Sequence, residues 1–120
     1  MLTVKKITSK ILAFRNARDW ARFHNPKDVA ISLSLEAAEL LEHFQWKNPK
    51  EIKKHIKTNK SAIADELADV LYWVLLLGHD LKIDVLAALD AKLKKNALKY
   101  PVEKAKGRYT KYTELKRPGK

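Results

Sequence analysis

Two pairs of acidic residues in this 120-residue chain have the spacing and the surroundings of a metal site. They read Glu36-Ala-Ala-Glu39 and Glu66-Leu-Ala-Asp69. A spacing of three residues puts both carboxylates of a pair on one face of a helix. Four carboxylates held together repel one another unless a cation lies between them, and oxygen ligands suit a hard divalent cation. We therefore predict that these four residues bind Mg²⁺, with Mn²⁺ able to replace it.

The acidic pairs lack the basic neighbours that surface acids usually have. No Lys or Arg lies within four residues of any of the four acids, although the chain has 25 basic residues. Helical ion pairs are therefore not available to them. No Glu-x-x-His motif occurs, which separates the pattern from that of di-iron bundles. Ligation by oxygen alone favours Mg²⁺ over iron or zinc.

The elements expected to hold these pairs are helices. Ala, Leu, Lys and Glu dominate the sequence and only three glycines occur, which favours an all-α fold. Asn25-Pro26 and Asn48-Pro49 are N-cap residues followed by a proline at the first helical position, and Asp84 is a further cap. We predict helices over residues 3–22, 26–46, 49–56, 60–80 and 84–99, with a break at 58–61 and an irregular tail over 102–120.

One stretch of the fourth predicted helix is apolar on every side. It runs from Val70 to Leu77, and a helix exposed on one face would not have this pattern. A second helix layer would explain the pattern, as would a partner subunit that covers Tyr72 and Leu76. Of these alternatives, we expect homo-oligomerisation.

Length and charge narrow the class of protein. A chain of this length is expected to form one domain over residues 1–120. The net charge is +11, and residues 91–120 carry eleven Lys or Arg against two acids. Such a basic tail suits nucleic acid or the phosphates of a small ligand, or is simply solvated. No cysteine is present, which fits a reducing cytoplasm, and no apolar run is long enough to span a membrane. Residues 1–18 hold five basic residues and no acid, which leaves a transit peptide open.

The segments around the acidic pairs resemble those of a known family. In chain order they are Arg18-Asp19-Trp20, Phe23-His24-Asn25-Pro26, Glu39-Leu-Leu-Glu-His-Phe-Gln-Trp46, Asp65-Glu-Leu-Ala-Asp-Val-Leu71, residues 96–101 and Lys111-Tyr-Thr-Glu-Leu115. Together with the two acidic pairs, they are similar to the all-α nucleoside triphosphate pyrophosphohydrolases, the MazG-like superfamily, in its dCTP pyrophosphatase-like branch. The resemblance extends over roughly residues 14–115.

This resemblance implies an enzyme that cuts a nucleoside triphosphate between its α- and β-phosphates. The products would be a monophosphate and pyrophosphate, and the role would be removal of unwanted nucleotides, with dCTP or an analogue favoured. The implied fold is a four-helix-bundle-type domain that forms a dimer or a dimer of dimers. The implied Mg²⁺ ligands are Glu36, Glu39, Glu66 and Asp69. Glu36 or Glu39 is also our candidate for the catalytic general base, with pure ligation as the alternative for each.

The aromatic residues include three candidates for contact with the nucleotide base. Trp20 and Trp46 match family positions where aromatic side chains stack on or enclose the base. Trp73, one turn after Asp69, matches a position usually held by Tyr. Packing in the core is the alternative for each tryptophan.

Residues near the carboxyl end are further candidates for substrate binding. Asn96, Lys99 and Tyr100 match the family's Asn-x-x-basic-Tyr-Pro element. Asn96 and Lys99 lie one helical turn apart, so an amide and an ammonium group can reach one ligand. Lys111 and Tyr112 are expected to close over the triphosphate. A solvated surface is the alternative for each lysine.

Two other classes of function remain open from the sequence. A basic helical protein could bind nucleic acid with its C-terminal arm, although no recognition motif for this is present and the acidic quartet would be unexplained. A regulatory nucleotide-binding module could keep the fold and turn over slowly. Production of monophosphate and pyrophosphate from a nucleoside triphosphate would distinguish an enzyme from these two classes of protein.

Overall fold

The structure, a computed structural model, describes residues 1–115. Within these residues all regular elements are helical, which confirms the all-α prediction. The chain divides into two compact units, Met1–Ile83 and a second that begins at Asp84. None of the described helices is long and apolar enough to cross a membrane. The prediction of one domain over residues 1–120 stays a prediction.

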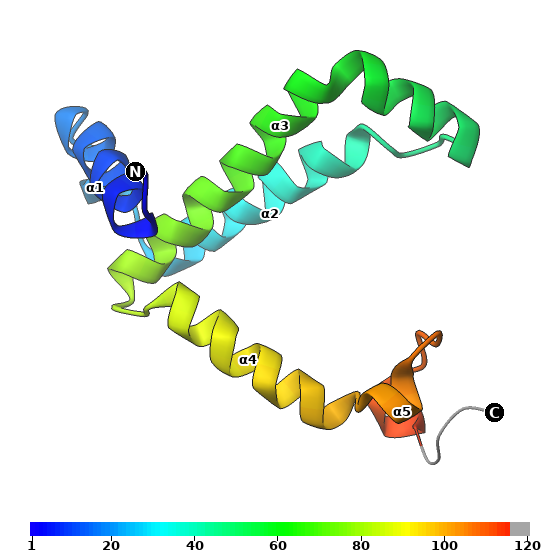
Figure 1. Ribbon diagram of the computed structural model, residues 1–120. Coiled ribbons are helices and arrows are strands. Elements are labelled where there is room, and N and C mark those ends of the chain that lie inside the picture. Colours follow the sequence, from blue (N-terminus) through cyan, green and yellow to red (C-terminus); the bar gives the residue numbers. More distant parts are fainter. Residues whose placement is uncertain (116–120) are drawn as a thin grey trace. The chain divides into compact units, whose positions relative to one another are not determined.

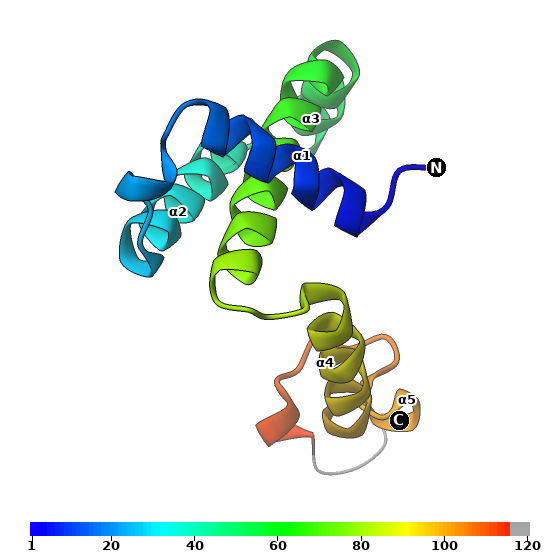
Figure 2. The same cartoon turned by 90° about the vertical axis from the view of Figure 1, so that its left-hand side faces the viewer.

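The first unit holds α1 (Val4–Ala17), the 3₁₀ turn η1 (Ala21–Phe23), α2 (Pro26–Glu42) and α3 (Pro49–Asp80). Helices α2 and α3 run antiparallel and side by side, and α1 packs against α3 (Figures 1 and 2). The two acidic pairs lie on α2 and α3, so this packing is what brings them together. The core of the described chain is small and consists of Ile11, Val29, Leu75 and Leu76.

The predicted starts of the helices at Pro26 and Pro49 are confirmed. The side chain of Asn25 accepts a hydrogen bond from the main-chain N–H of Asp28 at 2.9 Å. Asn48 and Glu51 form a reciprocal capping box, with bonds of 2.9 and 3.1 Å. These bonds satisfy N–H groups that the first turn of a helix otherwise leaves unpaired. They fix the first residues of α2 and α3, and therefore the positions of the acidic residues along the two helices.

Two predicted helices are longer than the real ones. Helix α1 ends at Ala17 because Asp19 has a left-handed φ of 54°, so Trp20 lies in the loop after it. Helix α2 ends at Glu42, and Trp46 has a left-handed φ of 64° in the turn that leads to α3. Asp visits this conformation more readily than most residues, whereas a bulky residue with positive φ is rare. No local signal in the sequence marked the turn at Trp46.

The predicted break at 58–61 is present as a kink, and not as a gap between two separate helices. Residues 49–80 form one helix, with non-helical angles at Asn59 alone (φ −126°, ψ 24°). The Asn59 side-chain amide donates to the main-chain oxygen of His55 at 3.1 Å. The side chain thus provides a hydrogen bond to a carbonyl group one turn earlier in the helix. A kink whose carbonyl is satisfied in this way interrupts the helix without ending it.

The second helix layer, one of the two explanations for the apolar stretch 70–77, is present within the chain, and coverage of Tyr72 by a partner subunit stays a prediction. Helix α1 provides the second layer, with the Phe14 ring 6.3 Å from the Tyr72 ring and Leu76 fully buried. A different apolar surface remains open on the packed pair. Exposed side chains occur in i, i+4 rows on α2 (Ile31 and Leu35) and on α3 (Leu67 and Leu71).

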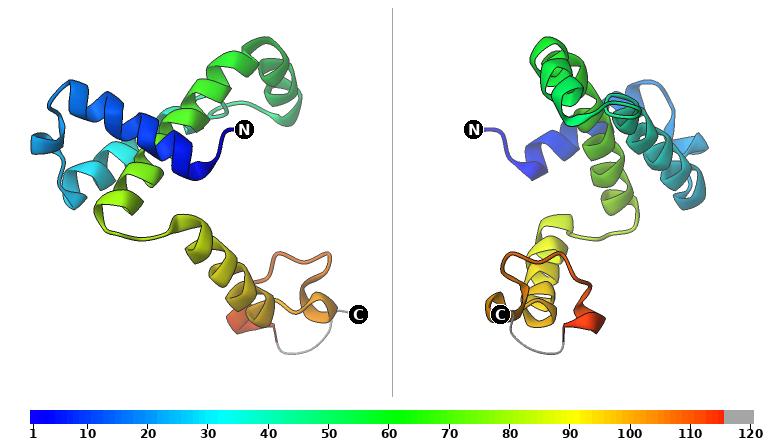
Figure 3. Two further views of the ribbon diagram at one scale, coloured as in Figure 1. Left: turned by 60° about the vertical axis from the view of Figure 1, so that its left-hand side comes forward. Right: turned by 90° about the vertical axis from the view of Figure 1, so that its right-hand side faces the viewer.

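The second unit contains α4 (Val85–Lys99), the short helix α5 (Val102–Ala105) and the 3₁₀ turn η2 (Tyr112–Glu114) (Figure 3). Asp84 caps α4 as predicted, accepting from the N–H of Ala87 at 3.0 Å. The predicted irregular tail is only partly irregular, since Pro101 accepts two main-chain hydrogen bonds that form the turn of α5. The remainder of the predicted tail, residues 116–120, lies outside the described residues.

A buried ion pair joins the end of α1 to the end of α3. Arg15 donates to both carboxylate oxygens of Asp80, at 2.8 and 3.0 Å. The Arg15 side chain is 9% exposed and that of Asp80 is 25% exposed. Planar, two-bond pairing of this kind fixes orientation as well as distance. It holds α1 against the carboxyl end of α3.

We expect Asp80→Ala to lower the free energy of unfolding by about 2–3 kcal/mol, because it leaves a buried guanidinium without its partner. Urea unfolding followed by circular dichroism measures the change. Arg22→Ala is the control, since it breaks an exposed pair with Asp19 and should cost less than about 1 kcal/mol. Equal losses in the two variants would contradict a structural role for the Arg15 pair.

Candidate metal and nucleotide site

The packing of α2 against α3 gathers the four predicted acids into one cluster. One carboxylate oxygen from each of Glu36, Glu39, Glu66 and Asp69 lies within 4.8 Å of the other three. Glu36 and Glu66 are half-buried, and Glu39 and Asp69 are exposed. A single cation placed among four such oxygens could touch all of them.

Two oxygens in the cluster lack a partner. Glu36 Oε2 and Glu66 Oε2 are buried and accept no hydrogen bond within the described chain. Buried carboxylate oxygens are nearly always paired or bound to a metal, because water no longer solvates them. The orphaned atoms therefore fit a site for a divalent cation with oxygen ligands.

Burial and mutual repulsion both favour protonated carboxyl groups in the cluster. Burial, hydrogen bonding with Glu39 and the charges of Glu39, Asp69 and Glu66 raise the pKa of Glu36 from 4.5 to about 7. Burial, hydrogen bonding with Glu39 and the charges of Glu39 and Asp69 also raise the pKa of Glu66. Without a cation, the cluster relieves its repulsion by holding protons.

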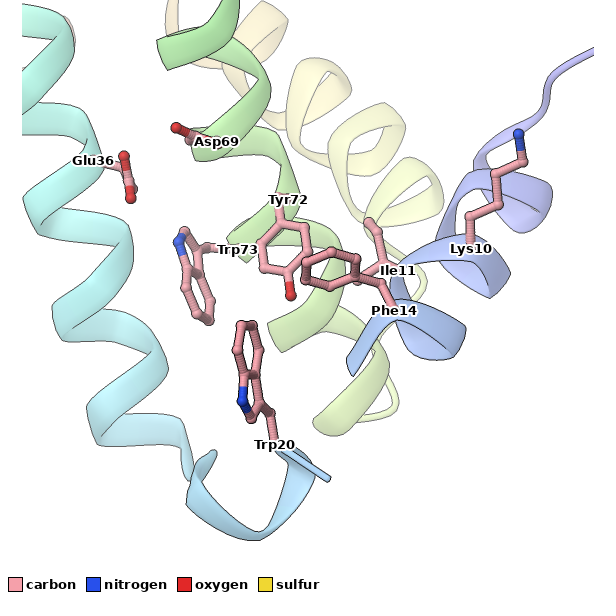
Figure 4. A pocket seen from close by; sticks show the side chains of 8 residues that line it. All are labelled: Lys10, Ile11, Phe14, Trp20, Glu36, Asp69, Tyr72 and Trp73. Carbon is pink, nitrogen blue, oxygen red and sulfur yellow. The ribbon is translucent and has the colours of Figure 1, made fainter. Parts of the chain in front are cut away.

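An aromatic pocket opens beside the cluster. Its volume is about 430 Å³, and Figure 4 shows its lining residues, which are Lys10, Ile11, Phe14, Trp20, Glu36, Asp69, Tyr72 and Trp73. Glu36 and Asp69 belong to both the pocket and the acidic cluster. A ligand in this pocket would therefore have one end against aromatic rings and the other against the carboxylates.

The rings of the pocket support one another edge to face. Trp20 lies 5.7 Å from Phe14, Phe14 lies 6.3 Å from Tyr72, and Tyr72 lies 5.0 Å from Trp73. The ring of His24 continues this row at 5.5 Å from Trp73. Such contacts favour one arrangement of the rings, and flat rings with π faces suit a planar heterocyclic ligand.

The predicted base-contacting tryptophans separate into two groups. Trp20 and Trp73 line the pocket, whereas Trp46 does not and is 92% exposed. The sequence did not single out Phe14 or Tyr72 as ligand contacts. Phe14 lies on the apolar stripe of the first predicted helix, and Tyr72 lies in the stretch 70–77 that is apolar on every side. Neither pattern distinguishes a pocket wall from a core residue.

The predicted residues near the carboxyl end lie in the second unit, which is described by itself. Lys99 Nζ lies 4.7 Å from the centre of the Tyr112 ring, and the Tyr100 ring lies 6.0 Å from that of Tyr112. Asn96 is half-buried on α4, and Lys111 immediately precedes η2. Their proposed contacts with substrate stay predictions.

Comparison with known proteins gives consistent matches. A family profile described as "MazG-like family" matches residues 31–115. The chain is 33% identical to proteins named dCTP pyrophosphatase 1 from Rattus norvegicus and Homo sapiens, over 96% and 94% of its length and 69% and 68% of theirs. A crystal structure of a pyrophosphatase from Archaeoglobus fulgidus is 37% identical, with a TM-score of 0.78 over 81% of this chain and 91% of the other.

The raised pKa of Glu36 predicts a dependence of stability on pH in the metal-free protein. A carboxyl group with a higher pKa in the folded chain holds its proton more tightly when folded. Its contribution is therefore complete below pH 4.5 and is lost as the pH rises towards about 7. We expect a loss of roughly 1–2 kcal/mol, reduced by the partial exposure of the side chain.

Urea unfolding in the presence of a chelator, at pH values from 4.5 to 8, measures this effect. Glu36→Gln should flatten the decline, while Glu42→Gln, an exposed acid on the same helix, should leave it unchanged. An equal decline in wild type and Glu36→Gln would contradict the raised pKa.

Proposed function

The chain belongs to the MazG-like family of nucleotide pyrophosphohydrolases, and we propose that it is a Mg²⁺-dependent enzyme that converts dCTP or a close analogue to the monophosphate and pyrophosphate. The observation that carries this proposal is the junction of two features. A cluster of four carboxylates, two of them with an orphaned oxygen, shares Glu36 and Asp69 with an aromatic pocket. That junction suits a ligand with a planar ring at one end and metal-bound phosphates at the other.

The metal requirement follows from charge. A nucleoside triphosphate carries about four negative charges, and the cluster offers four carboxylates, so the two repel each other without a cation. Glu36, Glu39, Glu66 and Asp69 would hold Mg²⁺. When bound, Mg²⁺ would neutralise charge on the phosphates and on the departing pyrophosphate.

The protein's own groups supply the remaining steps. A carboxylate that is not fully used in ligation can take the proton from the attacking water. Glu36 and Glu39 are the candidates, because both belong to the acidic cluster and Glu36 also lines the pocket. The rings of Trp20 and Trp73 would hold the base of the nucleotide, each stack contributing on the order of 1–3 kcal/mol.

Preference for cytosine rests on the relatives. The proteins from rat and human that this chain resembles are named for dCTP. We propose dCTP or a close analogue as the substrate for this reason.

The exposed apolar rows on α2 and α3 suit a second copy of this chain. A pair of packed helices with exposed Leu67 and Leu71 is half of a four-helix bundle. We propose a homodimer, or a dimer of dimers, in which these rows are buried. We also propose a cytoplasmic location. The chain has no cysteine and so does not depend on disulfide bonds, which a reducing cytoplasm would not maintain.

Loss of one acid from each pair should abolish catalysis without unfolding the chain. We expect Glu39→Gln and Asp69→Asn each to lower kcat/KM for dCTP by at least about 100-fold, because each removes a charged ligand. Glu51→Gln, in the cap of α3, is the control for general effects of losing a charge. The assay follows monophosphate and pyrophosphate for each dNTP with Mg²⁺. Full activity in either variant would contradict the metal assignment.

Disruption of the apolar rows should give monomers. We expect the double variant Leu67→Glu/Leu71→Glu to halve the mass found by light scattering, because buried charges oppose association. Leu2→Glu, at an exposed leucine near the amino end, should leave the mass unchanged. A wild-type protein that is already monomeric would overturn the oligomer proposal.

A further inference from the structure

One wall of the aromatic pocket is formed by a residue of a loop. Trp20 follows the left-handed Asp19 after α1 and is 42% exposed, so the core does not enclose its side chain. The main chain of the loop is fixed, because the Trp20 N–H donates to the Arg15 carbonyl oxygen at 3.1 Å. Figure 4 shows the Trp20 ring on the loop and the Phe14 ring on α1, whose centres lie 5.7 Å apart. The orientation of the Trp20 ring therefore depends on the side chains around it.

Arg18 lies against both rings. Its guanidinium carbon, Cζ, is 3.8 Å from the centre of the Phe14 ring and 5.8 Å from that of Trp20. Its Nη1 also donates to the main-chain oxygen of Phe14 at 2.9 Å. A guanidinium within about 6 Å of an aromatic face is attracted to it, and its planar shape allows stacking and hydrogen bonding at the same time. One side chain therefore joins the ring on α1 to the ring in the loop.

These contacts, and not an ion pair, orient the guanidinium. Within residues 1–115, none of the ion pairs involves Arg18. Arg18 is exposed and is not one of the residues that line the pocket, whereas Phe14 and Trp20 both line it. The Arg18 side chain thus supports two rings of the wall without forming part of the wall itself.

We propose that Arg18 is a positioning residue for the nucleotide base, because it holds the Trp20 ring against Phe14 before a ligand binds. The inference rests on the proposed function, since it takes the aromatic pocket as the site of the base. A ring that is already oriented loses less conformational freedom when the ligand arrives, so its preorganisation contributes to affinity. Arg18 therefore affects binding of the nucleotide and leaves the rate of the cutting step unchanged.

Arg22, in the adjoining turn η1, offers a matched control. Its guanidinium carbon lies 5.3 Å from the centre of the Phe23 ring, and its Nη1 pairs with Asp19 at 3.1 Å. Phe23 is not one of the residues that line the pocket. Arg22→Met therefore removes the same kind of contact from a ring outside the pocket. A general effect of losing an arginine from this part of the chain would occur in both variants.

The first test is the orientation of the rings in the protein without metal or nucleotide. Nuclear Overhauser effects between the ring protons of Phe14 and Trp20 measure their contact. We expect these effects in the wild type and in Arg22→Met, and their loss or marked weakening in Arg18→Met. Unchanged effects in Arg18→Met would overturn the proposal, whatever the substrate of the protein is.

The second test is steady-state hydrolysis, with Mg²⁺, of the dNTP that the wild type prefers, which we expect to be dCTP. Arg18→Met should raise KM about 3- to 5-fold with kcat unchanged, which corresponds to loss of a cation–π contact at an exposed site. Arg18→Lys keeps a positive charge near the rings and should raise KM less. Arg22→Met should have the KM of the wild type. An unchanged KM in Arg18→Met, or equal KM values in Arg18→Met and Arg18→Lys, would overturn the proposal.

The two tests together separate this inference from the proposed function. A raised KM with unchanged Overhauser effects in Arg18→Met would indicate direct contact between Arg18 and the phosphates, and would overturn the positioning role alone. A fall in kcat at unchanged KM would overturn it as well, because a ring that holds the base contributes to binding. Absence of turnover of any nucleotide by the wild type would overturn the proposed function, while the Overhauser effects would still decide whether Arg18 holds the two rings together.

Discussion

The repulsion among four carboxylates is the constraint on which the rest of this structure depends. Helices α2 and α3 hold the oxygens of Glu36, Glu39, Glu66 and Asp69 within 4.8 Å of one another. Within residues 1–115, none of the ion pairs involves any of these four acids. Protons relieve this repulsion only in part, as the raised pKa of Glu36 indicates. A divalent cation would relieve it more fully and would then present a positive centre to a phosphate chain. Under the proposed function, the site would give up stability of the metal-free fold for affinity towards a metal-bound ligand.

Helix caps, an ion pair and an aromatic contact hold the acidic helices in place against that repulsion. The reciprocal cap at Asn48 and the Asn25 cap fix the starts of the two helices. The buried Arg15–Asp80 pair and the Phe14–Tyr72 contact hold α1 against α3, and these same elements form the wall of the aromatic pocket. The position of the pocket is thus a consequence of how the acidic helices are stabilised. One set of contacts holds the carboxylates together and builds the cavity beside them.

Local sequence signals predicted the helix starts and the spacing of the acids. They did not predict features that depend on side-chain conformation or on packing between helices. The caps at Asn25, Asn48 and Asp84 are local signals, and the helix starts followed from them. The end of α2 and the continuation of α3 through Asn59 depend on a left-handed Trp46 and on a side-chain bond to a carbonyl, which no periodicity reports. The acidic spacing predicted that each pair shares a face, and the structure shows that the faces meet. The aromatic wall needed the packing of three helices, so the sequence could not place it.

A crystal structure with Mn²⁺ and a dCTP analogue that resists hydrolysis between its α- and β-phosphates tests the central claim most directly. Anomalous scattering locates Mn²⁺ without reference to the surrounding protein. We predict a peak at about 2.0–2.3 Å from oxygens of the α2 and α3 acidic pairs, with the base of the analogue against Trp20 and Trp73. A peak at another set of residues, or a triphosphate bound with the four carboxylates free of metal, would contradict the account.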